Sequence, residues 1–139
     1  MGEEIMILLD TDIIIEIVDK HSEKGESVIK KILDSGEGYC TSSLNVHELM
    51  YGIHKYSKDG ASILRIPVIN YTKEDGELSS RLEISAEQKG KAVPRMDSMI
   101  ASIAINNNCN FYTFDDHFRV FTDSGLKLFE QKQNGPVDI

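Results

Sequence analysis

The chain has 139 residues, of which 40% are hydrophobic and 27% are charged, and these values predict one compact domain that can build a real core. Fifteen basic residues against 23 acidic residues give a formal net charge of −8, which argues against a general nucleic-acid-binding surface because such surfaces are basic. The same balance leaves open a nuclease, because a bound metal ion offsets an acidic site locally.

Apolar residues recur with the spacings of short buried strands that alternate with amphipathic helices. The expected strands cover 5–9, 39–41, 63–69, 110–113 and 127–129. The expected helices cover 13–18, 22–35, 42–57, 72–89 and 96–107, with a short helical piece through Phe118 and Val120. Asp12 is predicted to cap the first helix and Gly36 to end the second. Pro67 marks 63–69 as an edge or irregular strand.

This alternation predicts a three-layer α/β/α sandwich around a central, mainly parallel sheet of four to five strands. We expect a single domain over residues 1–130 and a polar tail over 131–139. In such sheets ligands bind beyond the carboxyl ends of the strands, near the point where the strand order reverses.

The start of the chain, its longest apolar region and its cysteines predict a cytoplasmic protein. The acidic start, MGEEIM, has no signal-peptide pattern. The longest apolar region, 5–18, contains three acidic residues and is too short to span a membrane. Cys40 and Cys109 sit in apolar stretches without metal-ligand spacing, which predicts reduced core residues.

Four acidic residues follow or open the expected elements, namely Asp10, Glu48, Asp97 and Asp115. Three of them adjoin apolar runs, where a carboxylate is costly unless something compensates it. Asp10 follows the first strand and Asp115 comes two residues after Thr113, so the two meet if their strands are neighbours. Mg²⁺ or Mn²⁺ is the partner best suited to clustered oxygen ligands. The pattern therefore favours a metal-dependent phosphoryl-transfer enzyme.

Four motifs surround these acids, and together they span nearly the whole chain. They are LLDTD at 8–12, NVHELMYG at 45–52, MDSMIASIA at 96–104 and YTFDDHF at 112–118. Their order resembles that of the PIN-domain family, which has Asp-(Ser/Thr)-Asn after a strand, a helical Glu-Leu-x-x-Gly, Asp-x-x-Ile-Ala at a helix start, and Thr-x-Asp-x-x-Phe. A single domain of this length most resembles the VapC-type toxins of toxin–antitoxin pairs.

The resemblance implies a Mg²⁺- or Mn²⁺-dependent endoribonuclease that is usually a homodimer and is held inactive by a small antitoxin. It implies catalytic roles for Asp10, Glu48, Asp97 and Asp115. Asp10 and Asp97 would be the nearest metal ligands, Asp115 a second or water-mediated one, and Glu48 a general base or a holder of metal-bound water.

Hydroxyl and basic side chains near the motifs are candidates for contacts with the RNA substrate. Thr11 and Thr113 are placed to orient carboxylates or to contact phosphate, because a hydroxyl both donates and accepts. Arg95, with Lys89 and Lys91, precedes the third motif and is a candidate for attracting the RNA backbone, although the pattern favours a solvated charge run.

Other interpretations remain open at several positions. Asp12 stands where the family has Asn or Ser, and it either supports a second ion or only caps a helix. Asn45 and Glu48 have nearly the spacing of a capping box, and Asp116 competes with its neighbour Asp115. The apolar residues Ile13, Ile14, Ile17 and Val18 are core, dimer interface or a surface that receives a partner helix.

Two rival functions also fit parts of the pattern. A haloacid-dehalogenase-type phosphatase would use Asp10 as nucleophile and Asp12 as acid/base, but Ile14 stands where that family has Thr or Ser. A non-catalytic PIN-like module would bind RNA or protein without cleaving it.

Overall fold

The structure is a computed structural model that describes residues 5–18 and 22–129. Five parallel strands form one sheet in the order β3-β2-β1-β4-β5. The strands are β1 (Met6–Leu9), β2 (Gly38–Ser42), β3 (Val68–Ile69), β4 (Asn110–Tyr112) and β5 (Lys127–Leu128). The predicted three-layer α/β/α sandwich with a parallel sheet is confirmed.

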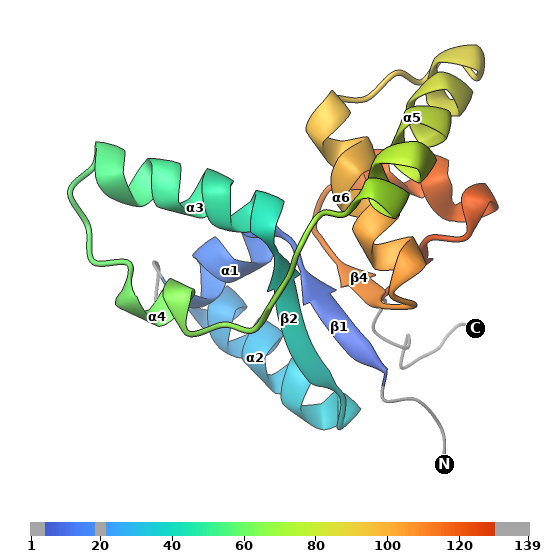
Figure 1. Ribbon diagram of the computed structural model, residues 1–139. Helices are drawn as coiled ribbons and strands as arrows, with labels where there is room; N and C mark the ends of the chain where they lie inside the picture. Colours follow the sequence, from blue (N-terminus) through green and yellow to red (C-terminus); the bar gives the residue numbers. More distant parts are fainter. Residues whose placement is uncertain (1–4, 19–21, 130–139) are drawn as a thin grey trace.

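Helices cover both faces of this sheet (Figure 1). One layer contains α1 (Thr11–Val18), α2 (Glu23–Ser35), α3 (Ser43–Lys55) and the short α4 (Ala61–Leu64). The other contains α5 (Lys73–Gln88), α6 (Arg95–Asn106) and the 3₁₀ helix η1 (Asp116–Ser124). None of the helices within 5–18 and 22–129 is long and apolar enough to cross a membrane.

The central strand β1 joins two hydrophobic cores because successive side chains of a strand point to opposite faces. Ile7 and Leu9 pack with the α1–α4 layer, whereas Leu8 packs with α5, α6 and η1. Cys40 and Cys109 are buried in the second core with free thiols, which confirms them as core residues.

Local capping signals set several helix ends where the sequence predicts them. Ser22 caps α2 by accepting a hydrogen bond from Gly25 N at 3.0 Å, and Gly36 ends this helix in the left-handed conformation with φ 72°. Thr72 and Asp75 form a reciprocal capping box at the start of α5.

Two local predictions were wrong. The strand expected over 63–69 is limited to Val68–Ile69 at the sheet edge, because Ile63 belongs to α4 and packs into the core. Asp12 does not cap α1, because the helix begins at Thr11 and places Asp12 inside its first turn. The polar tail predicted at 131–139 lies outside the described residues.

Candidate active site

A buried carboxylate ends β1 at the point where the strand order reverses, between β1 and β4. Asp10 is only 8% exposed. Its Oδ1 accepts hydrogen bonds from Thr11 N at 2.8 Å and Asn45 Nδ2 at 3.1 Å, and its Oδ2 accepts one from Thr113 Oγ1 at 2.7 Å. These donors come from α1, α3 and the end of β4, so one side chain ties three segments together.

Burial raises the pKa of Asp10 to about 7, because an ionised carboxylate loses hydration in the protein interior. The hydrogen bond from Thr113 lowers this pKa, and the negative charges of Asp12 and Glu48 raise it further. Asp10 is therefore a carboxylate that three hydrogen bonds hold in place, and the protein compensates its negative charge only partly.

Asn45 is a functional-site residue that the sequence analysis missed. It is fully buried, and its Nδ2 donates to both Asp10 Oδ1 and Thr11 Oγ1, at 3.1 and 3.0 Å. Ser42, and not Asn45, caps α3: Ser42 Oγ accepts from Asn45 N at 3.1 Å and donates to Asn45 Oδ1 at 2.6 Å. A serine at the strand end followed three residues later by Asn was the signal available in the sequence.

Glu48 lies one turn further along α3 and is half-buried. Its Oε1 accepts a 2.6 Å hydrogen bond from Thr11 Oγ1. The capping-box interpretation of Glu48 is therefore wrong, since this side chain reaches across to the end of β1 and not to its own helix start. Thr11 connects the first and second motifs directly.

Thr113 connects the fourth motif to the same centre. Its hydroxyl donates to Asp10 and accepts a hydrogen bond from Asp115 N at 3.0 Å. Asp115 caps η1, since its Oδ1 accepts from His117 N at 2.9 Å. The turn after β4 is thus fixed to the carboxylate after β1.

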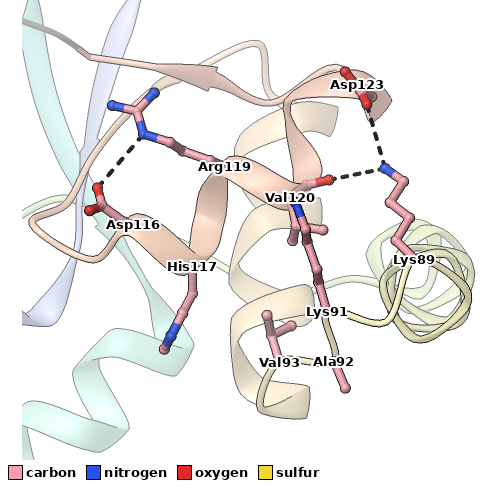
Figure 2. A pocket seen from close by; sticks show the side chains of 9 residues that line it. All are labelled: Lys89, Lys91, Ala92, Val93, Asp116, His117, Arg119, Val120 and Asp123. Atoms are coloured by element: carbon pink, nitrogen blue, oxygen red, sulfur yellow. Dashed lines mark hydrogen bonds and ion pairs between the residues drawn. The ribbon is translucent and has the colours of Figure 1, made fainter.

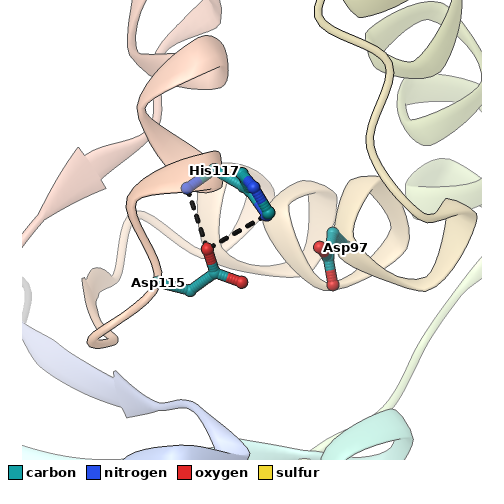
Figure 3. Close-up of side chains that lie close together, drawn as sticks. All are labelled: Asp97, Asp115 and His117. Carbon is teal, nitrogen blue, oxygen red and sulfur yellow. Dashed lines mark hydrogen bonds and ion pairs between the residues drawn. The ribbon is translucent and has the colours of Figure 1, made fainter.

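Asp97 stands in the first turn of α6 and faces Asp115 and His117 (Figure 3). Ligand atoms of these three side chains lie within 4.8 Å of one another. Burial raises the pKa of Asp97 to about 6, with further increases from the charges of Asp115 and Glu48. The charge of Glu48 raises the pKa of both Asp97 and Asp10. Among the described residues, only Asp97 and Asp115 of the four acids share a group of ligand atoms within 4.8 Å of one another.

A model of the PIN domain matches residues 7–123. The chain belongs to the PIN domain family. Ribonuclease VapC2 of Rickettsia felis is 26% identical to it over 113 residues, which cover 76% of this chain and 84% of that protein.

Solved structures agree with this assignment. VapBC2 of Rickettsia felis, bound to a DNA fragment from its promoter, superposes with a TM-score of 0.73 at 25% identity over 90% of this chain and 98% of that chain. FitAcB of Neisseria gonorrhoeae shares the fold, with a TM-score of 0.72 at 21% identity over 90% of this chain and 97% of the other.

The side chains of this PIN domain fit a divalent cation. Asp12 Oδ2 accepts a hydrogen bond from Phe114 N at 3.2 Å, whereas Asp12 Oδ1 is buried and has no hydrogen-bond partner among the described residues. An unpartnered buried carboxylate oxygen is costly, and so are acids whose pKa values are raised by burial. A hard cation would compensate both, because it prefers carboxylate oxygens.

The basic residues before the third motif of the PIN domain divide into two groups. Arg95 lies in the first turn of α6, but its guanidinium pairs with both carboxylate oxygens of Glu83, at 3.0 and 3.1 Å. Lys89 and Lys91 instead line a pocket of about 410 Å³ (Figure 2). This pocket is also lined by His117, which lies beside Asp97 and Asp115. The described residues that line it are Lys89, Lys91, Ala92, Val93, Asp116, His117, Arg119, Val120 and Asp123.

Proposed function

We propose that this PIN domain is a Mg²⁺- or Mn²⁺-dependent endoribonuclease, the toxin of a VapBC-type toxin–antitoxin pair. One observation carries the proposal: Asp97 and Asp115 bring ligand atoms within 4.8 Å of each other, and the charge of Glu48 acts on both Asp97 and the buried Asp10 at the switch point of the sheet. Membership of the PIN family removes the phosphatase alternative. Similarity to a protein named as a ribonuclease supports RNA as the substrate.

Each acid receives a role from its surroundings. Asp10, Asp97 and Asp115 would hold the cation. When bound there, the ion would neutralise charge on the scissile phosphate and make a water molecule more acidic. Glu48 is oriented through Oε1 by Thr11, and its carboxylate would take the proton of the attacking water. Thr113 fixes the position of Asp10 relative to the turn that contains Asp115, because its hydroxyl is hydrogen-bonded to both residues.

The pocket lined by Lys89, Lys91 and Arg119, here called the basic pocket, is consistent with an RNA strand that passes beside the acids. Lys89, Lys91 and Arg119 contribute cationic side chains to its lining. The ion pairs of Lys89 with Asp123, at 3.6 Å, and of Arg119 with Asp116, at 3.7 Å, are long and solvent-exposed, so each contributes little stability. Arg95, which the sequence nominated for substrate binding, would have to leave Glu83 first.

The proposal includes a protein partner, a homodimer and a cytoplasmic location. Ile13 and Ile14 are buried in the core, as the core interpretation predicts, but Ile17 lines an apolar pocket of about 220 Å³ with Leu33 and Tyr39. Leu33 is 71% exposed, which fits a surface that a helix of the antitoxin covers. The solved VapBC2 structure supports such a partner.

The test is cleavage of a mixed pool of structured RNAs by the purified chain, freed of copurified antitoxin, in Mg²⁺, Mn²⁺ or EDTA. Cleavage should require the metal and should be abolished in Asp97→Asn. Asp34→Asn is the matched control, because Asp34 is an exposed residue of α2 paired with Lys30. RNA binding by the native chain without cleavage in any metal would favour the non-catalytic module.

A further inference from the structure

His117 lies beside Asp97 and Asp115, and the proposed cleavage reaction assigns no role to its imidazole. His117 Nδ1 lies 3.2 Å from Asp115 Oδ1, and Asp97 completes a group whose ligand atoms lie within 4.8 Å of one another (Figure 3). Adjacent ligand atoms at about 2.1 Å from an octahedral ion are about 3 Å apart. The imidazole and Asp115 therefore already have the spacing of neighbouring ligands on one ion.

The position of His117 is set by the same hydrogen bonds that set the acids. Its backbone N–H donates to Asp115 Oδ1 at 2.9 Å, Asp115 N donates to Thr113 Oγ1 at 3.0 Å, and Thr113 Oγ1 donates to Asp10. The imidazole is thus attached to the acid cluster by a short, fixed turn. Its side chain is 70% exposed, so a cation from solution reaches it without any rearrangement of the core.

We propose that His117 supplies a nitrogen ligand to the same cation as Asp97 and Asp115, and that this nitrogen makes the site select Mn²⁺ over Mg²⁺. The inference rests on the proposed function, which places a divalent cation at these acids. Mg²⁺ is bound by oxygen ligands, whereas an imidazole ligand favours first-row transition metals. A site with carboxylates alone would discriminate less between the two ions.

A simpler role for His117 is to hold Asp115 through a hydrogen bond. That role needs a donor but no coordinating nitrogen. Glutamine retains a donor and an acceptor without the imidazole, so His117→Gln separates the two roles. His54→Gln is the matched control, because His54 is an exposed histidine in the last turn of α3.

The experiment is electron paramagnetic resonance of Mn²⁺ added to the full chain, with spin-echo modulation to detect coupling to a ligand nitrogen. We expect nitrogen coupling in the native protein and in His54→Gln, and its loss in His117→Gln. The Mn²⁺ affinity of His117→Gln should fall about tenfold or more, as losses around metal ligands do. Its Mg²⁺ affinity, measured by competition, should stay within about threefold.

The outcomes separate this inference from the proposed function. Bound Mn²⁺ without nitrogen coupling, or coupling that persists in His117→Gln, overturns the nitrogen ligand and leaves the metal-dependent nuclease standing. Equal losses of Mn²⁺ and Mg²⁺ affinity in His117→Gln would overturn the selectivity. A native chain that binds no Mn²⁺ overturns both the inference and the metal-dependent function.

Discussion

Replacing the carboxylate of Asp10 with an amide should stabilise the metal-free protein above neutral pH. Asp10→Asn keeps the size of the side chain and an oxygen that accepts from Thr11 N and Asn45 Nδ2. It removes a buried negative charge that lies near two other acids, Asp12 and Glu48. The gain is expected without metal, because a bound cation would compensate the same charge.

The magnitude follows from the pKa of Asp10, which rises from 3.8 to about 7 on folding. Between these two values the folded chain holds the proton more tightly than the unfolded chain, so the free energy of unfolding falls as pH rises. At about 1.4 kcal/mol per pH unit, the loss contributed by Asp10 reaches about 4 kcal/mol by pH 8 as an upper limit. The amide loses some hydrogen-bond strength, so a net gain of about 1–3 kcal/mol is expected.

The assay is urea unfolding in EDTA at pH 5 and pH 8 for the native chain, Asp10→Asn and the control Asp34→Asn. The native chain and the control should lose stability between pH 5 and pH 8, and Asp10→Asn should lose less. At pH 8 Asp10→Asn should exceed the native chain. A pH dependence equal to that of the native chain, or a variant less stable at pH 8, would refute the argument that burial of this charge is costly.

Two further predictions concern the polar network and the basic pocket. Asn45→Ala should lower the free energy of unfolding by about 2–4 kcal/mol, because it leaves several buried partners without a hydrogen bond. Urea unfolding of the variant and the native chain at one pH measures this loss. A loss under about 0.5 kcal/mol, which is typical of surface substitutions, would contradict the prediction. In an Asp97→Asn background, Lys91→Gln should reduce the salt dependence of single-stranded RNA binding by about 0.7 in the slope of log K against log salt. Lys30→Gln, on the exposed face of α2, should leave that slope unchanged, and equal slopes for both variants would remove Lys91 from the RNA path.

The sequence predicted the features of the fold that depend on local pattern. Periodicity and turn signals located four of the five strands and the main helices, including the glycine stop of α2. The strand expected over 63–69 failed because an apolar run does not distinguish a strand from a short buried helix. The burial of Ile63 in the hydrophobic core of the α1–α4 layer decided that case.

The site was predictable in its acids but not in the contacts that hold them. Asp10, Asp97 and Asp115 could be nominated because each adjoins the end of a helix or strand. Glu48, which lies inside α3, could be nominated from the resemblance to the PIN-domain family. The role of Asn45 and the identity of the carboxylate that Thr11 orients depend on contacts of α3 with Asp10 and Thr11, across 34 to 37 positions of sequence. Periodicity contains no information about such contacts. For the same reason the pairing of Arg95 with Glu83 across two helices was not visible.

Protons and the proposed cation should compete for the same oxygens, which makes metal affinity depend on pH in a defined direction. The pKa values of Asp10 and Asp97 are raised to about 7 and about 6, and both groups must be ionised to bind a cation. Mg²⁺ affinity should therefore rise between pH 5 and pH 7.5, by up to about tenfold per pH unit for each proton released.

Calorimetric titration of the native chain in two buffers with different ionisation enthalpies counts these protons directly. We expect proton release on Mg²⁺ binding at pH 6 and much less at pH 8.5, where both acids are already ionised. Asp97→Asn should release fewer protons at pH 6. Equal affinity and no proton release at both pH values would mean that the cation binds elsewhere. It would also mean that the buried acids serve the fold and not the chemistry.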